Sequence, residues 1–176
     1  ALGDRRDELV IATKGGIEWS PDGSRLIDGA ASTLRRQCDE SLDRLDTDRI
    51  DLYYLHAPDP NTPIEESASA IAELIQSGKI RYAGTSNCNL AQLETFHAIC
   101  PLTAIQPHYN MLQREIERDI LPWAARNQVG TVVYWPLLKG LLSGHLPRDF
   151  VFRPGDGRAK YPMFQGEEWE RNQGFL

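Results

Sequence analysis

The chain has 176 residues, of which 41% are hydrophobic and 25% charged, and its formal net charge is −6. This length suits one domain of ordinary size, and the composition is that of a globular protein rather than a disordered or collagen-like one. The acidic balance argues against a protein that binds nucleic acid or an anionic membrane, because both partners favour a basic surface.

Short apolar segments alternate with longer stretches of helical periodicity along the chain. Segments that are nearly continuous in apolar residues are typical of parallel strands covered on both faces. The five predicted strands span residues 9–13, 50–55, 80–85, 103–106 and 131–135. Their alternation with helices favours βα units and a parallel sheet.

The first two helices are predicted by an apolar stripe and by end signals. The stripe has the spacing of an α-helix and consists of Leu34, Cys38, Leu42 and Leu45. For the second helix, Thr62 supplies an N-cap hydroxyl, Pro63 the first helical position and Glu65 the third. Gly78 then marks the end of this helix.

The second half of the chain carries weaker helix signals. Asn89 predicts the start of a third helix as its N-cap. A fourth helix is expected over 116–128, and Pro122 inside it predicts a kink or a late start near Leu121. Residues 145–176 are rich in Pro, Gly, Arg and aromatic residues, which predicts a long loop with a terminal helical turn.

Five parallel strands joined by helices fit two architectures, an open doubly wound sheet or an arc of a (β/α)8 TIM barrel. An open sheet that binds nucleotides usually carries a Gly-rich phosphate loop after its first strand. Here the first strand is followed by Lys14-Gly15-Gly16, and no such loop occurs. The sequence therefore favours the barrel, with the open sheet as the alternative.

Polar or aromatic residues stand at the end of every predicted strand. They are Lys14, His56, Ser86 with Asn87, Gln106, and Tyr134 with Trp135. Taken alone, each of these residues also has a purely structural explanation: the lysine can extend its charged end into solvent, and the amides can cap the helices that follow. Because the carboxyl ends of parallel strands lie on one side of a barrel, their recurrence predicts that they converge on one functional cavity.

Other chemistries and compartments find less support. The histidines form no metal-binding motif, and the segment around Ser86 lacks the second glycine of a nucleophile elbow. Cys88 is a candidate reactive thiol without any signal that lowers its pKa. The cysteines are odd in number and widely spaced, and no segment reads as a signal peptide or a membrane helix. We therefore expect a cytoplasmic protein without disulfides, metal or membrane contact.

Five motifs follow one another over residues 10–144. They are Val10–Lys14, Ile50–His56, Gly78–Asn87, Ala104–Asn110 and Tyr134–Gly144. In this order they resemble the aldo-keto reductases, whose patterns include G-K-I-R-x-x-G-x-S-N and V-Q-x-x-Y-N. The resemblance implies NADPH-dependent reduction of a small aldehyde or ketone. It also implies that residues 1–176 form a single partial barrel domain covering the third to seventh βα units.

The resemblance assigns roles to individual residues. Lys14 and His56 match the catalytic lysine, which lowers the pKa of a tyrosine acid, and the histidine that orients the carbonyl. The nicotinamide of NADP(H) would contact Ser86, Asn87, Gln106 and, by stacking, Tyr134. The cofactor phosphates would lie near Leu137, Lys139, Leu142, Ser143 and Arg158. Trp135 replaces a serine of the family pattern and is expected to narrow or reshape this cofactor site.

The chain also departs from the family pattern. The catalytic aspartate and tyrosine belong to a D-T-A-x-x-Y-G motif that does not occur in residues 1–176, and the chain is shorter than the roughly 250 residues of a typical barrel. We therefore expect an incomplete, inactive catalytic site. The chain would be a fragment of a longer gene product, a truncated protein that oligomerises through open barrel edges, or a non-catalytic relative. A module that binds NADP(H) or docks to a partner, and a structural domain without a site, are the alternative functions.

Overall fold

The computed structural model describes residues 3–174, which fall into two compact units. The first unit comprises the described part of Ala1–Pro107 together with Glu115–Val133, and the second comprises His108–Arg114 and the described part of Tyr134–Leu176. No helix among residues 3–174 is long and apolar enough to cross a membrane.

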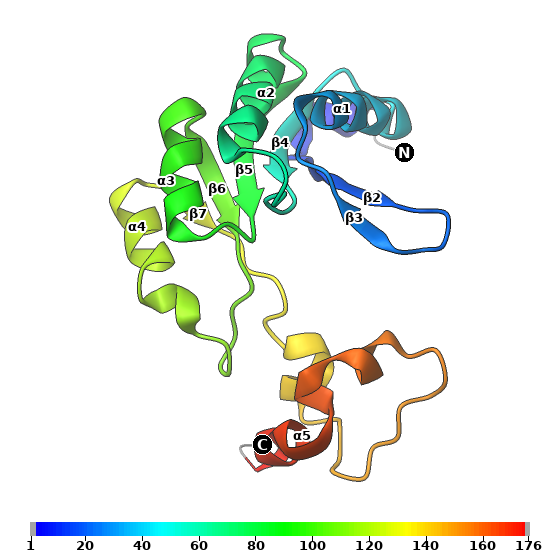
Figure 1. The fold of residues 1–176 in the computed structure, drawn as a ribbon. Helices are drawn as coiled ribbons and strands as arrows, with labels where there is room; N and C mark the ends of the chain where they lie inside the picture. Colours follow the sequence, from blue (N-terminus) through cyan, green and yellow to red (C-terminus); the bar gives the residue numbers. More distant parts are fainter. Residues whose placement is uncertain (1–2, 175–176) are drawn as a thin grey trace. The chain divides into compact units, whose positions relative to one another are not determined.

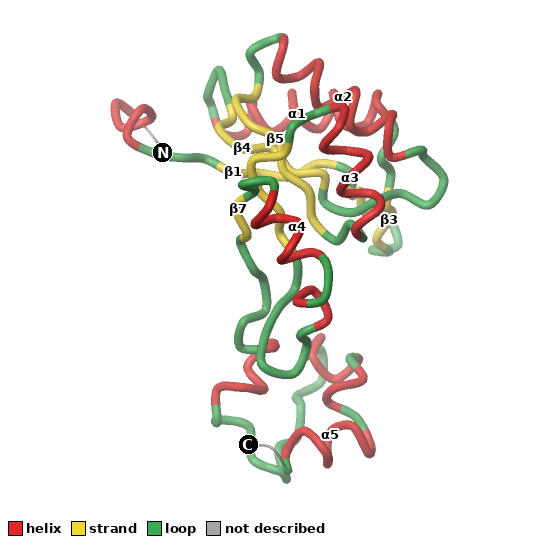
Figure 2. Tube along the Cα trace, turned by 90° about the vertical axis from the view of Figure 1, so that its left-hand side faces the viewer, coloured by secondary structure: helices red, strands yellow, loops and turns green. Residues whose placement is uncertain are grey.

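A parallel sheet of five strands forms the first unit, in the order β1-β4-β5-β6-β7. The strands are β1 (Ala12–Gly15), β4 (Ile50–Leu55), β5 (Ile80–Ser86), β6 (Leu102–Gln106) and β7 (Gly130–Thr131). The helices between them are α1 (Ala31–Leu45), α2 (Ile64–Gln76), α3 (Leu90–Ile99) and α4 (Ile120–Arg126). They lie on one face of the sheet (Figures 1 and 2), which confirms the predicted incomplete (β/α)8 barrel.

The first and last strands are shorter than predicted. Leu9 and Val10 are 39% and 83% exposed, and the Ile11 N–H bonds to the Asp51 carboxylate at 2.9 Å instead of joining the sheet. The strand therefore begins at Ala12 and not at Leu9.

At the other edge, β7 ends at Thr131, whereas the prediction extended to Trp135. The Val132 N–H still bonds to the Ile105 carbonyl at 2.9 Å. Beyond it, Tyr134 forms only an isolated bridge with His108, in the second unit. The apolar run 131–135 thus contains only the second residue of β7, and it continues from the first unit into the second.

The helix ends confirm one predicted cap and correct another. The Asn89 side chain accepts a hydrogen bond from the Gln92 N–H at 2.9 Å, and Gln92 accepts one from the Asn89 N–H, which completes a capping box at α3. The predicted cap at Thr62 is wrong, because its hydroxyl donates to Asp59 at 2.7 Å and α2 begins after Pro63 without a side-chain cap.

Three further elements complete the first unit. Helix α4 begins at Ile120, with Asp119 as its N-cap and Pro122 in its first turn, which confirms the late start; a 3-10 turn, η2 (Glu115–Glu117), precedes it. A hairpin of β2 (Ile17–Trp19) and β3 (Arg25–Ile27) follows β1, and the sequence analysis did not predict it. The N-terminal segment η1 (Gly3–Glu8) is a 3-10 helix.

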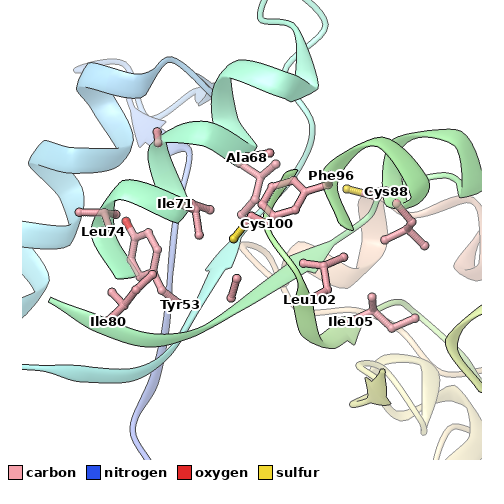
Figure 3. Packing of buried hydrophobic residues seen from close by; sticks show 14 of the residues in the cluster. Tyr53, Ala68, Ile71, Leu74, Ile80, Cys88, Phe96, Cys100, Leu102 and Ile105 are labelled. Carbon is pink, nitrogen blue, oxygen red and sulfur yellow. The ribbon is translucent and has the colours of Figure 1, made fainter. Parts of the chain in front are cut away.

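One apolar core lies between the sheet and its helices (Figure 3). Tyr53 and Leu55 of β4 are fully buried in it, as are Ile71 of α2 and Phe96 of α3. Burial of such side chains contributes about 1.5–3 kcal/mol each to folding. Because side chains alternate along a strand, Tyr54 must point to the opposite face.

The second unit has a small core of its own. Its elements are η3 (Leu138–Ser143), η4 (Gly157–Lys160), η5 (Pro162–Phe164) and α5 (Gly166–Gln173). Phe164 and Trp169 pack with Leu138 and Leu141 in this core. The segment expected as a long loop therefore contains three short helical elements among its described residues, because Phe164 and Trp169 are buried in this core.

Candidate functional site

The register of the sheet places Lys14 on the face opposite the helices. Lys14 pairs with Tyr54, and Tyr54 pairs with Gly84. Residues in register across a parallel sheet point to the same side. Since Tyr53 faces the helices, Lys14 and Tyr54 both face away from them.

His56 follows directly on β4 and belongs to the same group. Burial is the main reason that its pKa is lowered from 6.5 to about 4, and the positive charges of Lys14 and Arg25 lower it further. The His56 N–H also bonds to the Gly15 carbonyl at 2.8 Å, which places His56 beside Lys14 at the rim of the sheet, while Arg25 lies on the hairpin strand β3. At neutral pH the imidazole is uncharged and can donate one N–H to a carbonyl oxygen.

We expect His56 to titrate near pH 4 in the folded chain, well below its ordinary pKa of 6.5. The neutral side chain then stabilises the fold fully above pH 6.5, and this contribution is lost as the pH falls towards 4. NMR of the imidazole protons measures the midpoint, and Lys14→Met should raise it. A midpoint at 6.5 would contradict the burial and charge described here.

Side chains at the ends of β5 and β6 tie three strands together. The Ser86 hydroxyl donates to the Gln106 carbonyl at 2.6 Å. The Asn87 amide donates to the His56 carbonyl at 2.9 Å and to the Ser86 hydroxyl oxygen at 3.0 Å. Asn87 adopts the left-handed backbone conformation (φ 63°), which Asn tolerates better than most residues.

The Gln106 side chain completes this rim. It is half-buried, pairs in register with Ser86, and its amide has no hydrogen-bond partner among residues 3–174. The structure thus brings five predicted site residues to one end of the first unit: Lys14, His56, Ser86, Asn87 and Gln106. They offer a cation, a neutral imidazole and amide groups, which suit a carbonyl and a carboxamide.

The other predicted residues lie in the second unit. The Tyr134 carbonyl accepts a hydrogen bond from the Tyr109 N–H at 3.3 Å. The ring of Tyr134 stands edge-on to the Trp135 ring at 5.3 Å between centroids. Trp135 has a left-handed backbone (φ 56°), and its carbonyl accepts a hydrogen bond from Asn110 at 3.3 Å.

Lys139 is held by aromatic rings. Its ammonium lies 4.0 Å from the centroid of Trp135 and 4.3 Å from that of Tyr161, and such cation–π contacts contribute about 0.5–2 kcal/mol each. Trp135, expected to reshape the cofactor site, thus contacts the lysine beside it. In the same segment Leu137 is 56% exposed and Leu142 is half-buried in the second core.

Ser143 and Arg158 flank the same turn. The Ser143 hydroxyl donates to the Gly140 carbonyl at 2.6 Å, and a Cβ atom on Gly140 would lie 3.6 Å from an Arg158 nitrogen. Arg158 also pairs with Asp156 at 2.7 Å and, mainly through its hydrogen bonds, lowers the pKa of that carboxyl to about 2. The second unit therefore gathers two cations, Lys139 and Arg158, around one tight turn.

Two residues at these sites were not predicted. Arg25 lies on the hairpin that the sequence did not reveal, so no signal pointed to it. Asn110 belongs to the V-Q-x-x-Y-N segment, and its side-chain Oδ1 atom accepts hydrogen bonds from the N–H groups of Leu112 and Gln113 at 3.0 Å. Its fixed side chain then holds the backbone of Trp135.

Cys88, the candidate thiol, has an environment that opposes reactivity. Its side chain is buried in the core, and burial raises its pKa to about 12. Because the thiolate is the nucleophile, this thiol is protonated at neutral pH. Cys38 and Cys100 are likewise free and buried.

Each unit, taken by itself, offers donor groups that suit one part of a nicotinamide dinucleotide. In the first unit, the amides of Asn87 and Gln106 lie at neighbouring strand ends and suit a carboxamide. Lys139 and Arg158 in the second unit suit phosphates, because ammonium and guanidinium groups both bind these anions.

Comparison with protein families identifies a match along almost the whole chain. The model of the Aldo/keto reductase family matches residues 1–173. The aldo-keto reductase YhdN of Bacillus subtilis is 41% identical over 162 residues, which are 92% of this chain and 48% of the relative. The chain thus spans about half the length of this relative.

Solved structures of the same family have the same fold. The glycerol dehydrogenase of Gluconobacter oxydans superposes with a TM-score of 0.88 at 36% identity, over 98% of this chain and 54% of that one. An aldo/keto reductase from Klebsiella pneumoniae, solved in complex with NADP and acetate, has a TM-score of 0.67 at 28% identity, over 84% of this chain and 50% of that one.

Proposed function

This chain belongs to the aldo/keto reductase family, and from that premise we propose that it supplies part of a site that reduces aldehydes or ketones with NADPH. The main support is the rim of the first unit, where Lys14 and His56 are electrostatically coupled and Asn87 and Gln106 lie at neighbouring strand ends. The NADP complex of the Klebsiella pneumoniae relative supports the choice of cofactor.

Each residue of the rim has a chemical task in this proposal. When bound, NADPH supplies a hydride to the carbonyl carbon, and negative charge develops on the carbonyl oxygen. The Lys14 ammonium stabilises that charge, and the neutral His56 donates a hydrogen bond to the same oxygen. Asn87, Ser86 and Gln106 orient the carboxamide of the nicotinamide, while Lys139 and Arg158 bind phosphate oxygens.

The proton donor is the part that this chain lacks. None of its six tyrosines lies in a D-T-A-x-x-Y-G segment. Tyr53 and Tyr54 are also poor acids, because burial raises the pKa of both phenols. A carbonyl reduced by hydride must gain a proton, so we propose that residues 1–176 alone are catalytically inactive.

A turnover assay tests this proposal on the chain itself. We expect purified protein to show no steady oxidation of NADPH in the presence of a small aldehyde, because the general acid is absent. Cofactor affinity, measured in the same samples by NADPH fluorescence, reports on the binding residues separately. Steady NADPH oxidation by the 176-residue chain would contradict the proposal.

The second candidate function is a module that binds NADP(H) without catalysis, which the missing tyrosine motif favours. Lys14→Met distinguishes it from the enzyme in a protein that also contains the remaining barrel segments. If the protein is a binding module, it shows no turnover before the substitution, and its affinity for the cofactor persists after Lys14→Met. For an enzyme, turnover is present and falls when Lys14 is replaced.

The edges of the sheet bear on association. Among residues 3–174, β1 and β7 each pair with one strand only, so each leaves one edge of the sheet unpaired. A hollow of about 740 Å³ lies beside the β1 edge and is lined in part by α1. Unpaired strand edges favour pairing with another chain. We therefore expect the isolated chain to self-associate as its concentration rises, which sedimentation equilibrium measures. A monomer over the whole concentration range would contradict this expectation.

A further inference from the structure

The proposed function gives Lys14 a central task, but its ammonium has no ion pair among residues 3–174. It lies instead beside an aromatic ring: the Nζ atom is 5.7 Å from the centroid of the Tyr54 ring. This distance is within the range of a cation–π interaction. Tyr54 is therefore the group that can define where the ammonium lies.

The Tyr54 ring is itself fixed by the neighbouring strand. A Cβ atom on Gly84 would lie 2.5 Å from the Tyr54 Cε1 atom, so the ring occupies the space that a side chain at Gly84 would need. The pairing between β5 and β6 shifts register at Ala83 and Gly84. Tyr54 is only 2% exposed, although it points away from the apolar core.

Resting on the proposed function, we propose that Tyr54 is a positioning residue for Lys14 and that Gly84 is required because the Tyr54 ring lies against it. The face of the ring attracts the ammonium and holds it at the rim beside His56. A side chain at Gly84 would displace the ring, and the ammonium would then lose its support. This assigns a role to the central glycine of the G-K-I-R-x-x-G-x-S-N segment.

The titration of His56 reports on this arrangement without any cofactor. The charged groups that lower its pKa are Lys14 on β1 and Arg25 on β3. If Tyr54 holds Lys14 near the imidazole, Tyr54→Leu should raise the NMR midpoint from about 4 towards 6.5. Gly84→Ala should raise it as well, whereas Tyr54→Phe, which keeps the ring, should leave it unchanged.

A double-mutant comparison separates positioning from loss of burial. In the Lys14→Met background, Tyr54→Leu should not raise the His56 midpoint further, because the Lys14 charge that the Tyr54 ring positions is already absent. An equal rise with and without Lys14 would overturn the proposal, as would a rise in Tyr54→Phe equal to that in Tyr54→Leu.

One measurement needs no destabilising variant. In the wild-type chain we expect NOE contacts between the Lys14 ε-protons and the Tyr54 ring protons, and their absence would overturn the proposal even if Tyr54→Leu does not fold. In an active protein that contains this chain, Tyr54→Leu should lower kcat roughly two- to fivefold with little change in KM. The NMR experiments use no cofactor. They therefore test the role of Tyr54 even if the chain does not bind NADPH.

Discussion

Replacing Lys14 by methionine should lower carbonyl reduction by about 10²–10⁴-fold in an active protein that contains this chain. The substitution keeps most of the length of the side chain and removes the positive charge that β1 places near His56. That charge is proposed to act on the developing oxyanion and on the proton donor, so its loss affects the transition state more than binding. The measurement is kcat with NADPH and a small aldehyde.

The matched control is the same change at another lysine. Lys79 forms an ion pair with Asp39 at 2.5 Å, at the opposite end of β5 from Ser86 and Asn87, and Lys79→Met should leave kcat unchanged. NADPH affinity should survive in both variants. Wild-type turnover after Lys14→Met would show that Lys14 is not part of the reacting site.

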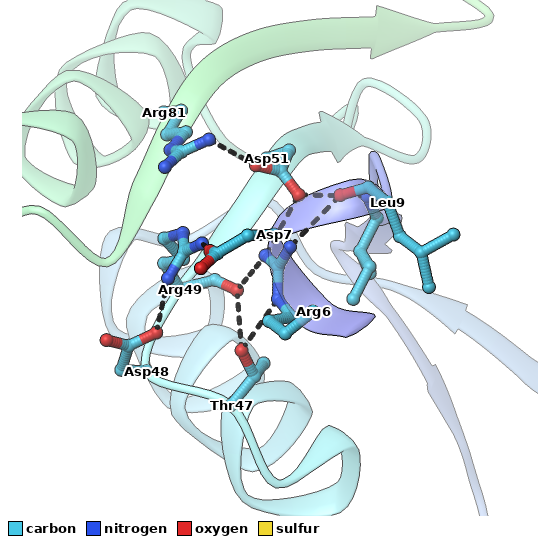
Figure 4. A network of polar contacts seen from close by, with 9 residues as sticks. Arg6, Asp7, Leu9, Thr47, Asp48, Arg49, Asp51 and Arg81 are labelled. Carbon is cyan, nitrogen blue, oxygen red and sulfur yellow. Dashed lines mark hydrogen bonds and ion pairs between the residues drawn. The ribbon is translucent and has the colours of Figure 1, made fainter. Parts of the chain in front are cut away.

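Asp51→Ala should cause the largest loss of stability, about 3 kcal/mol in the free energy of unfolding. Asp51 lies at the start of β4, the end away from the proposed site, and its side chain is 5% exposed. It accepts a hydrogen bond from the Ile11 N–H at 2.9 Å. It also forms ion pairs with Arg6 at 2.9 Å and with Arg81 at 3.0 Å (Figure 4). Alanine would leave Arg6, whose side chain is 13% exposed, without its carboxylate partner.

The pH dependence of this effect follows from the same contacts. Burial alone would raise the pKa of Asp51, but the hydrogen bonds from Ile11 and Arg6 and the charge of Arg81 lower it below 3.8. The carboxylate therefore stabilises the fold fully above about pH 4, and this contribution is lost as the pH falls through the lowered pKa. Denaturant unfolding followed by circular dichroism measures both effects.

Asp48→Ala provides the comparison for an exposed carboxylate. Asp48 pairs with Arg49 at 3.1 Å and its side chain is 82% exposed, so its removal should cost less than about 1 kcal/mol. Equal losses for the Asp51 and Asp48 variants would contradict the structural role given to Asp51.

The sequence was most informative where one strong pattern governs the local structure. The apolar run from Ile50 to Leu55 is the strand observed, because its alternate side chains are buried on both faces of the sheet. Asn89 predicted the start of α3 because its capping bonds lie within four residues. The residues at the strand ends could be named because parallel strands place their carboxyl ends on one side.

The remaining features depend on side-chain partners that the sequence pattern does not specify. Thr62 reads as a cap, but its hydroxyl bonds to Asp59 instead. The hairpin after β1 is held by Gln37 of α1, whose side chain bonds to the Gly16 N–H at 2.7 Å and to the Ile17 carbonyl at 3.0 Å. No local pattern predicts this partner, and the same holds for Tyr161, which contacts Lys139 from a distant part of the sequence.

A crystal structure with NADP bound, of an active protein that contains this chain, tests the central claim most directly. We predict that the nicotinamide carboxamide hydrogen-bonds to Asn87 and Gln106, and that the reacting side of the ring faces Lys14 and His56. A nicotinamide bound away from these strand ends, with Asn87 and Gln106 untouched, would contradict the assignment of this rim as the reacting site.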